Sequence, residues 1–180
     1  LPRRTSVEDL RQENFADLVR SGQSMMWRAG ELIHLNSCYA PTVDDELIPE
    51  HPIAAFENGH QHQIPLLIGT NSDEASFGKF LFQRQSSRER AALRLLASFD
   101  PQHAPEVVAA YDGAVAREDF AHLLADALFW APSTRIATAH AKVAPTWMYR
   151  FDFASAVLKW LGLGAMHTAD LLAVFGDPFG

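Results

Sequence analysis

Two titratable residues, Glu74 and His167, stand in loops that follow predicted strands. Glu74 comes after the apolar run "PLLIG" in "IPLLIGTNSDEASF", and His167 stands in "LGLGAMHTAD", downstream of "TWMYRFDF". In open α/β sheets, functional groups gather beyond the carboxyl ends of the strands, so the two side chains could meet there. A carboxylate on one imidazole nitrogen sets the tautomer and stabilises the imidazolium, which leaves the other nitrogen to take a proton from a nucleophile. A plain surface loop with a solvated histidine is the alternative interpretation.

The elements that must position these loops are two strands with a helical block between them. The short apolar run at residues 65–69 is typical of a strand that is covered on both faces in a parallel sheet. Aromatic residues alternate with other types through residues 146–153, which predicts a second strand. The spacing of apolar residues between these runs predicts helices near 88–99, 103–111, 117–129 and 133–143. This order is typical of an α/β fold.

The N-terminal part of the chain reads as helices followed by a turn. Residues 6–20 form an amphipathic pattern that predicts a helix capped by Ser6 and ended by Gly22. A second helix is predicted from Ser24 to about residue 35, with Ser24 at its N-cap. Residues 38–53 contain short apolar pieces around two aspartates, which predict two small strands joined by a turn.

Composition places the chain among ordinary globular proteins. Hydrophobic residues make up 48% and charged residues 21% of 180 residues, and we expect one domain that spans residues 1–180. The formal net charge of −7 disfavours nucleic acid or an anionic membrane as a partner. The one cysteine, Cys38, excludes an intrachain disulfide, and we expect it to be a small buried hydrophobe. No apolar run is long enough to predict a membrane span.

Three longer motifs resemble one family. "PTVDDELIPEHPIAAFENG", "IPLLIGTNSDEASF" and "GAMHTADLLAVFG" follow one another in the chain. They are similar to P-V-x-D-G-x-x-L-P, x-x-G-x-N-x-x-E-[GA]-[ST]-x-F and G-x-x-H-G-x-E-x-x-x-V-F-G of the type-B carboxylesterases, the cholinesterase-like branch of the α/β-hydrolases. The resemblance covers most of residues 37–180. It implies part of an α/β-hydrolase fold, with a central, mostly parallel sheet flanked by helices, incomplete in this chain.

The resemblance also implies roles for four residues. Glu74 falls at the position of the family's catalytic acid and His167 at that of its catalytic histidine. Ser76 matches a small hydroxyl residue beside the acid that supports the site, and Asp170 stands where the family has a glutamate near the histidine. The implied reaction is hydrolysis of a small-molecule carboxylic ester by a Ser-Glu-His triad, without cofactor or metal.

The chain departs from the family pattern at several positions. Asp45 and Thr168 replace glycines, and Ala75 stands where glycine or alanine is usual. Aspartate tolerates left-handed backbone geometry, so the change at Asp45 is mild. Asp170 is shorter than the usual glutamate, which puts the support of His167 in question.

The nucleophile is missing from these residues. No G-x-S-x-G elbow and no glycine-rich oxyanion loop occurs in the chain, and "SGQSMMW" around Ser24 lacks the second glycine. We therefore expect an internal segment of an esterase, truncated at both ends and inactive alone. Two alternatives remain open at this point. One is a non-catalytic binding or adhesion module, and the other is a split product that self-associates or joins a complementary esterase segment, because a cut sheet leaves unpaired edges.

Other candidate residues have simpler interpretations. His60 and His62, with Glu57, could suggest a metal site, but a surface loop before the strand is favoured because the spacing places no further ligand. His122 and Asp126, four residues apart on a predicted helix, read as a solvated pair. For the family's aromatic acyl pocket the chain offers three tryptophans, for which core packing is the default: Trp130, Trp147 and Trp160. A cytoplasmic bacterial protein is expected, with secretion as the alternative.

Overall fold

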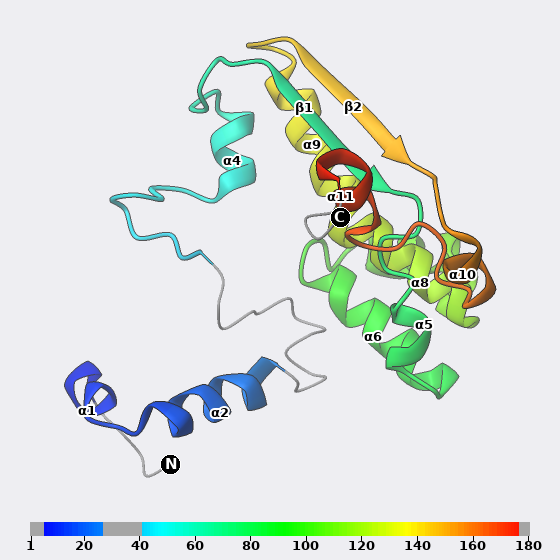
Figure 1. The fold of residues 1–180 in the computed structure, drawn as a ribbon, viewed down its shortest axis with the longest axis horizontal. Coiled ribbons are helices and arrows are strands. Elements are labelled where there is room, and N and C mark those ends of the chain that lie inside the picture. The colour runs from blue at the N-terminus through cyan, green and yellow to red at the C-terminus, as the bar shows by residue number, and fades with distance from the viewer. Residues whose placement is uncertain (1–5, 27–40, 177–180) are drawn as a thin grey trace. The chain divides into compact units, whose positions relative to one another are not determined.

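The computed structural model describes residues 6–26 and 41–176 of the chain (Figure 1). The chain divides into two compact units, Leu1–Thr42 and Val43–Gly180, and each is described here by itself. Cys38 and most of the helix predicted from Ser24 onwards lie outside the described residues. The prediction of a single domain stays a prediction.

Among the described residues of the first unit, two helices cover the segment 6–20, for which one helix was predicted. Helix α1, Val7–Arg11, begins at Ser6, whose Oγ accepts the backbone N–H of Asp9 at 3.1 Å, so the predicted cap is confirmed. Helix α2, Phe15–Met26, restarts after Asn14, whose Oδ1 accepts the N–H of Ala16 at 2.9 Å. Asparagine favours such a restart because its side chain competes with the backbone for hydrogen bonds.

Two predictions for this unit are therefore wrong. Helix α2 continues through Gly22, and Ser24 lies inside it, where its Oγ donates to the carbonyl of Ser21 at 2.8 Å. Ser24 is not an N-cap. The amphipathic spacing of the whole segment outweighs a single glycine, which costs a helix only about 1 kcal/mol.

Residues 41–51 contain a turn and neither of the two strands predicted over 38–53, and the first three residues of that prediction lie outside the described residues. Asp44 Oδ1 accepts the backbone N–H groups of Glu46, Leu47 and Ile48 at 3.1, 2.9 and 2.8 Å. These bonds, the one from Ile48 first, lower the pKa of Asp44. Asp45 has a φ of 61°, the left-handed geometry expected there. A side chain that satisfies three successive N–H groups removes the need for a strand partner.

Both predicted strands are present, and they are parallel neighbours. Strand β1, Leu66–Asn71, pairs with β2, Thr146–Phe151, in a register that sets Leu66 beside Thr146 and Asn71 beside Phe151. Parallel strands need a long crossover. The intervening helices supply it, so the carboxyl ends of both strands meet at one edge of the sheet (Figure 1).

Most of the other described residues of this unit belong to helices. The four helices predicted between the strands are confirmed within a few residues, as α6, α7, the α8–η2 pair and α9. The segments are α4 (Pro52–Glu57), α5 (Gly78–Leu81), α6 (Gln85–Ala97), α7 (Ala104–Ala110), the 3₁₀ turn η1 (Asp112–Ala114), α8 (Arg117–Ala125), the π-helical turn η2 (Asp126–Trp130), α9 (Ala131–His140), α10 (Ala156–Trp160) and α11 (Ala169–Phe175). Among the described residues, none of these helices is long and apolar enough to cross a membrane.

The core lies between α6 and α8. Its largest fully buried side chains are Leu95, Phe120 and Leu123, and the ring of Phe82 meets that of Phe120 edge to face at 5.6 Å. Arg88 is buried and donates to backbone carbonyls on both sides, among them Phe82 O at 3.0 Å. This cluster stabilises the helices that lie between the two strands in the sequence.

The sheet is covered unevenly. Helix α9 packs against both strands on one face (Figure 1). On the other face, the register partners Leu67 and Trp147 are 69% and 56% exposed. Coverage of β1 on both faces is thus wrong for the residues the structure describes, because a second helical layer is not among them.

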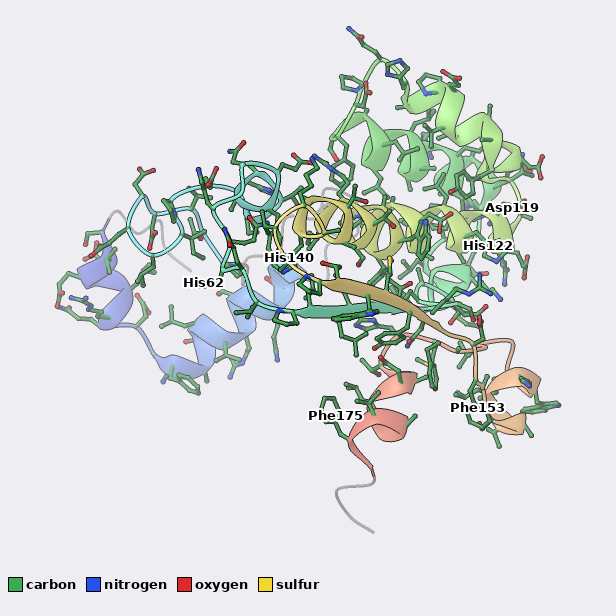
Figure 2. All side chains as sticks on the ribbon, turned by 90° about the horizontal axis from the view of Figure 1, so that it is seen from above. His62, Asp119, His122, His140, Phe153 and Phe175 are labelled. Carbon is green, nitrogen blue, oxygen red and sulfur yellow. The ribbon has the colours of Figure 1, made fainter. Side chains whose placement is uncertain are left out.

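The tryptophans follow the same pattern. Trp130, Trp147 and Trp160 are 43%, 56% and 84% exposed, so the core packing expected of them is wrong in this part of the chain. Phe153 and Phe175, labelled in Figure 2, are exposed as well. These apolar side chains stand on surfaces that no described element covers.

Candidate active site

The acid loop, residues 72–77, leaves the carboxyl end of β1 in a tight turn. Ser76 N donates to Asp73 O at 3.0 Å, and Gly78 N donates to Ala75 O at 2.7 Å. Within this turn Glu74 is only 7% exposed, and its Oε1 accepts the backbone N–H of Asn71 at 2.8 Å. The acid is therefore held by the last residue of its own strand.

The histidine loop, residues 161–168, is tied to the acid loop through Asp73. Asp73 N donates to Ala165 O at 3.1 Å, and Ala165 N donates back to Asp73 Oδ2 at 3.0 Å. Gly164 has a φ of +59°, and a Cβ there would lie 2.3 Å from that same oxygen. The loop thus needs a glycine at this point, and Asp73 has a structural role beside the buried Glu74.

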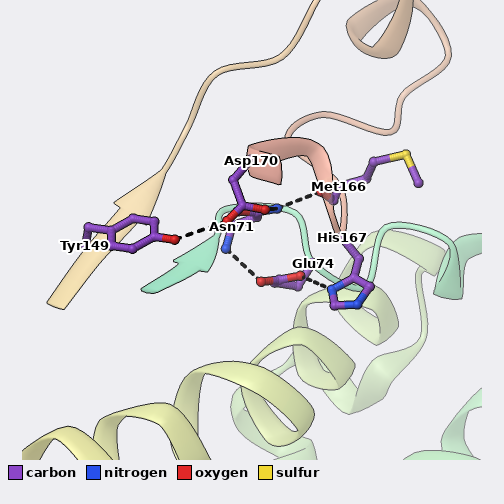
Figure 3. Close-up of polar contacts among 6 residues, drawn as sticks. All are labelled: Asn71, Glu74, Tyr149, Met166, His167 and Asp170. Carbon is purple, nitrogen blue, oxygen red and sulfur yellow. Dashed lines mark hydrogen bonds and ion pairs between the residues drawn. The ribbon is translucent and has the colours of Figure 1, made fainter. Parts of the chain in front are cut away.

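This docking brings Glu74 and His167 together (Figure 3). Nδ1 of His167 lies 2.7 Å from Glu74 Oε2. Because an ionised carboxylate only accepts, Nδ1 is assigned as the donor. The side chain of His167 is 51% exposed and that of Glu74 only 9%, so the acid is enclosed and the imidazole faces outward. Within the described residues, Nδ1 is the ring nitrogen of His167 that has a hydrogen bond.

Phe129 contacts the outward-facing imidazole. The two ring centroids lie 4.9 Å apart with an interplanar angle of 46°. Phe129 belongs to the π-helical turn η2, a geometry that often occurs at functional sites. The sequence carries no signal for this contact, because a π turn shifts side chains off the regular helical spacing.

A polar network backs the pair. Asn71 Nδ2 donates to Met166 O at 2.8 Å and to Asp170 Oδ1 at 3.2 Å, and Tyr149 Oη donates to Asp170 Oδ2 at 3.1 Å (Figure 3). Burial first, then the carboxylate of Asp170 and the charge of Glu74, raise the pKa of Tyr149. Asn71 and Tyr149 were missed from the sequence, although Asn71 is the asparagine of the G-x-N-x-x-E motif.

Two of the predicted departures have visible consequences. Thr168 has a φ of 71°, a left-handed geometry that strains a β-branched residue and suits the usual glycine. Asp170 reaches both Asn71 and Tyr149 despite its shorter side chain. Ser76 is 3% exposed, and its Oγ has no hydrogen-bond partner among the described residues.

The other polar candidates have no hydrogen bond to this pair among the described residues. Ser24 belongs to the first unit. His60 pairs with Glu50, and Glu57 pairs with Arg135 at 2.7 Å, and the described residues contain no cluster suited to a metal ion. The predicted His122–Asp126 pair is wrong, because Asp126 lies in the π turn and accepts the hydroxyl of Tyr111.

A pocket of about 230 Å³ adjoins the buried side of Glu74. Its charged lining residues are Glu74, Asp126 and Arg150, and Trp130 forms part of its wall. Burial first, and then the bond to Asp126, raises the pKa of Tyr111 to about 12. The phenol therefore stays protonated and keeps Asp126 in place across the neutral range.

Comparison with known proteins identifies relatives. The sequence pattern of the Carboxylesterase family matches residues 2–180. The chain is 34% identical over 142 residues to the para-nitrobenzyl esterase of Bacillus subtilis. The matched region covers 77% of this chain and 28% of that protein. The chain is 26% identical to the pyrethroid hydrolase Ces2a of Mus musculus, over 82% of this chain and 30% of that protein.

Solved structures agree with these matches. A PNB esterase superposes with a TM-score of 0.72 at 28% identity, over 94% of this chain and 35% of that one. A thermophilic PNB esterase superposes with a TM-score of 0.71 at 30% identity, over 94% and 34%. The predicted partial α/β-hydrolase fold is thus confirmed, and the chain spans about a third of the length of the relatives it matches. The chain belongs to the carboxylesterase family.

Proposed function

We propose that this chain supplies the acid and the general base of a serine carboxylesterase, with Glu74 and His167 in those roles. The observation that carries the proposal is the 2.7 Å contact between Glu74 Oε2 and His167 Nδ1, with a buried acid and a half-exposed ring. Family membership supplies the reaction class.

The chemistry follows from this geometry. Nε2 of His167 takes the proton of a serine hydroxyl as the serine oxygen attacks the ester carbonyl, and Glu74 stabilises the resulting imidazolium. His167 then gives that proton to the departing alcohol. Water, deprotonated by the same nitrogen, cleaves the acyl-serine and regenerates the enzyme. Neither a metal nor a cofactor takes part.

The serine and the oxyanion donors are proposed to lie outside these 180 residues. The chain has no G-x-S-x-G elbow and spans about a third of its relatives' length. The isolated chain therefore does not turn over esters. Its substrates in the whole protein are small carboxylic esters, in line with the esterase and hydrolase names of its relatives.

A graft tests the roles of the two residues. The matching segment of the Bacillus para-nitrobenzyl esterase is replaced by this chain, and hydrolysis of a short-chain aryl ester is measured. We expect activity that falls by about 10³-fold or more in His167→Gln and substantially in Glu74→Gln, because triad members act as a unit. His62→Gln, which changes an exposed histidine in a loop, is the matched control and keeps full activity.

Two outcomes would contradict the proposal. A graft whose activity survives His167→Gln removes the base role, and a folded but inactive graft favours the non-catalytic binding module. The isolated chain is assayed in parallel with a serine-directed phosphonate probe. No labelling is expected, and labelling of Ser24 would place the nucleophile inside this chain.

A further inference from the structure

One residue reaches both halves of the proposed catalytic pair. Asn71, the last residue of β1, is 5% exposed. Its backbone N–H donates to Glu74 Oε1 at 2.8 Å, and its Nδ2 donates to the carbonyl of Met166 at 2.8 Å. Met166 directly precedes His167. Asn71 is therefore hydrogen-bonded both to the acid and to the backbone next to the imidazole.

The orientation of the Asn71 amide is set from one side. Nδ2 faces two acceptors, Met166 O and Asp170 Oδ1, whereas Oδ1 of Asn71 has no hydrogen-bond partner in the described part of the chain. Asp170 is in turn held at its other oxygen by the hydroxyl of Tyr149 at 3.1 Å. Without Asp170 and Tyr149, only the contact with Met166 would orient the amide.

The register of the two strands places the Tyr149 hydroxyl within reach of Asp170. Tyr149 lies opposite Gly69 in the parallel pair, and a Cβ on Gly69 would come within 2.2 Å of the tyrosine ring. The ring therefore lies across β1, over the one position without a side chain. Its hydroxyl then reaches Asp170 on α11.

From these contacts we infer that Asn71 is a positioning residue that fixes Glu74 against His167, with its amide orientated by the Tyr149–Asp170 pair. This inference rests on the proposed function, since it assigns a role toward the same two side chains. Asn71, Asp170 and Tyr149 act through the pair and do not touch the reacting atoms.

The test uses the full 180-residue chain and the Nδ1 proton of His167, observed by NMR at neutral pH. A proton in a short bond to a carboxylate resonates far downfield. His167→Gln identifies the signal, and Glu74→Ala must abolish it. The exchange rate of this proton with water reports how firmly the two side chains are held, and thermal unfolding reports the stability of the fold separately.

Tyr149→Phe removes one hydroxyl and keeps the ring over Gly69. We expect the Nδ1 proton to exchange roughly three- to tenfold faster, the factor that corresponds to one lost hydrogen bond of ordinary strength. Thr146→Val is the matched control. It removes a hydroxyl that donates to Ala144 O at 3.1 Å at the opposite end of β2, and it leaves the exchange rate unchanged.

Exchanging the amide and the carboxylate between positions 71 and 170 tests the same contact a second way. Asn71→Asp keeps the shape but sets two carboxylates against each other, so the downfield signal is lost. Adding Asp170→Asn restores a donor between positions 71 and 170 and leaves Met166 O without one. We expect the double variant to recover the signal in part, with a proton that exchanges faster than in the unaltered chain.

The outcomes separate the two proposals. If the unaltered chain has no downfield proton that depends on Glu74, the catalytic pair is wrong and the inference falls with it. A second outcome is a proton that is present but exchanges no faster in the Tyr149→Phe variant than in the Thr146→Val variant. In that case the inference is overturned while the pair stands. Should Asn71→Asp fail to fold, Tyr149→Phe alone decides.

Discussion

The groups that hold Glu74 and those that hold the backbone around His167 differ in where they lie along the chain. Glu74 is held by Asn71, three residues earlier, and its turn closes on itself. The histidine loop has local backbone bonds, such as Leu163 N to Leu158 O, but its residues Ala165 and Met166 are held by Asp73 and Asn71, which are 92 and 95 residues away. The buried acid is thus positioned by local structure, and the half-exposed imidazole by distant parts of the fold. Changes to the distant contacts should disturb the histidine more than the acid.

Gly164→Ala should give the largest effect. The new Cβ would meet the Asp73 carboxylate at the contact that docks the histidine loop, so we expect a loss of about 3 kcal/mol in the free energy of unfolding. Gly162→Ala is the matched control, with a φ of +71° and no atom within 4 Å of the added carbon. It should cost only about 1 kcal/mol. Urea unfolding of both variants checks this, and equal losses would mean that Gly164 is not a docking position.

Asp73→Ala should be next, at about 2 kcal/mol, because it removes a carboxylate that accepts from Ala165 N and from Ser72 Oγ. The loss of protection from hydrogen exchange should be confined to the histidine loop. Hydrogen exchange of the Ala165 amide should accelerate strongly, whereas that of the Asn71 amide, which binds Glu74, should change little. Equal acceleration of both amides would show that the two loops open as one unit.

Thr168→Gly should stabilise the chain by about 1 kcal/mol, because glycine relieves the left-handed strain after the histidine. A rise in the melting temperature checks this. Thr138→Gly, in the middle of α9, is the control and should lower the melting temperature, since a helix gains nothing from glycine there. If both variants lose stability, the backbone at Thr168 is not strained.

Tyr111 should give the smallest effect at neutral pH, together with a defined pH dependence above pH 10. Its pKa in the folded chain is about 12, above the unfolded value of 10.0, so the folded state keeps this proton longer. The stability from the Tyr111–Asp126 bond is thus complete below pH 10 and falls as the pH rises towards 12. Comparing melting temperatures over this range with those of Tyr111→Phe checks it. The variant should show a shallower decline, and identical slopes would contradict the prediction.

Residues near one another in sequence were the predictable part of this protein. The strands at 65–69 and 146–153, the helices between them, the Ser6 cap and the left-handed Asp45 are all found, because periodicity and turn chemistry act over a few residues. The failures are also informative. Average spacing does not reveal features that depend on a single side chain or on a locally shifted helical register. Three such features are the helix that restarts at Asn14, the Asp44 carboxylate that accepts three N–H groups, and the π turn at 126–130.

The order of the motifs, the types of Glu74 and His167, and the absence of a nucleophile elbow were determined by the sequence alone. The fold decided what those residues touch. The pairing of Asp73 with Ala165, the reach of Asn71 to Met166, and the passage of Tyr149 over Gly69 are contacts across the parallel pair and its loops. Such contacts depend on strand register, which forms only when distant segments pack, and no pattern within either segment encodes it.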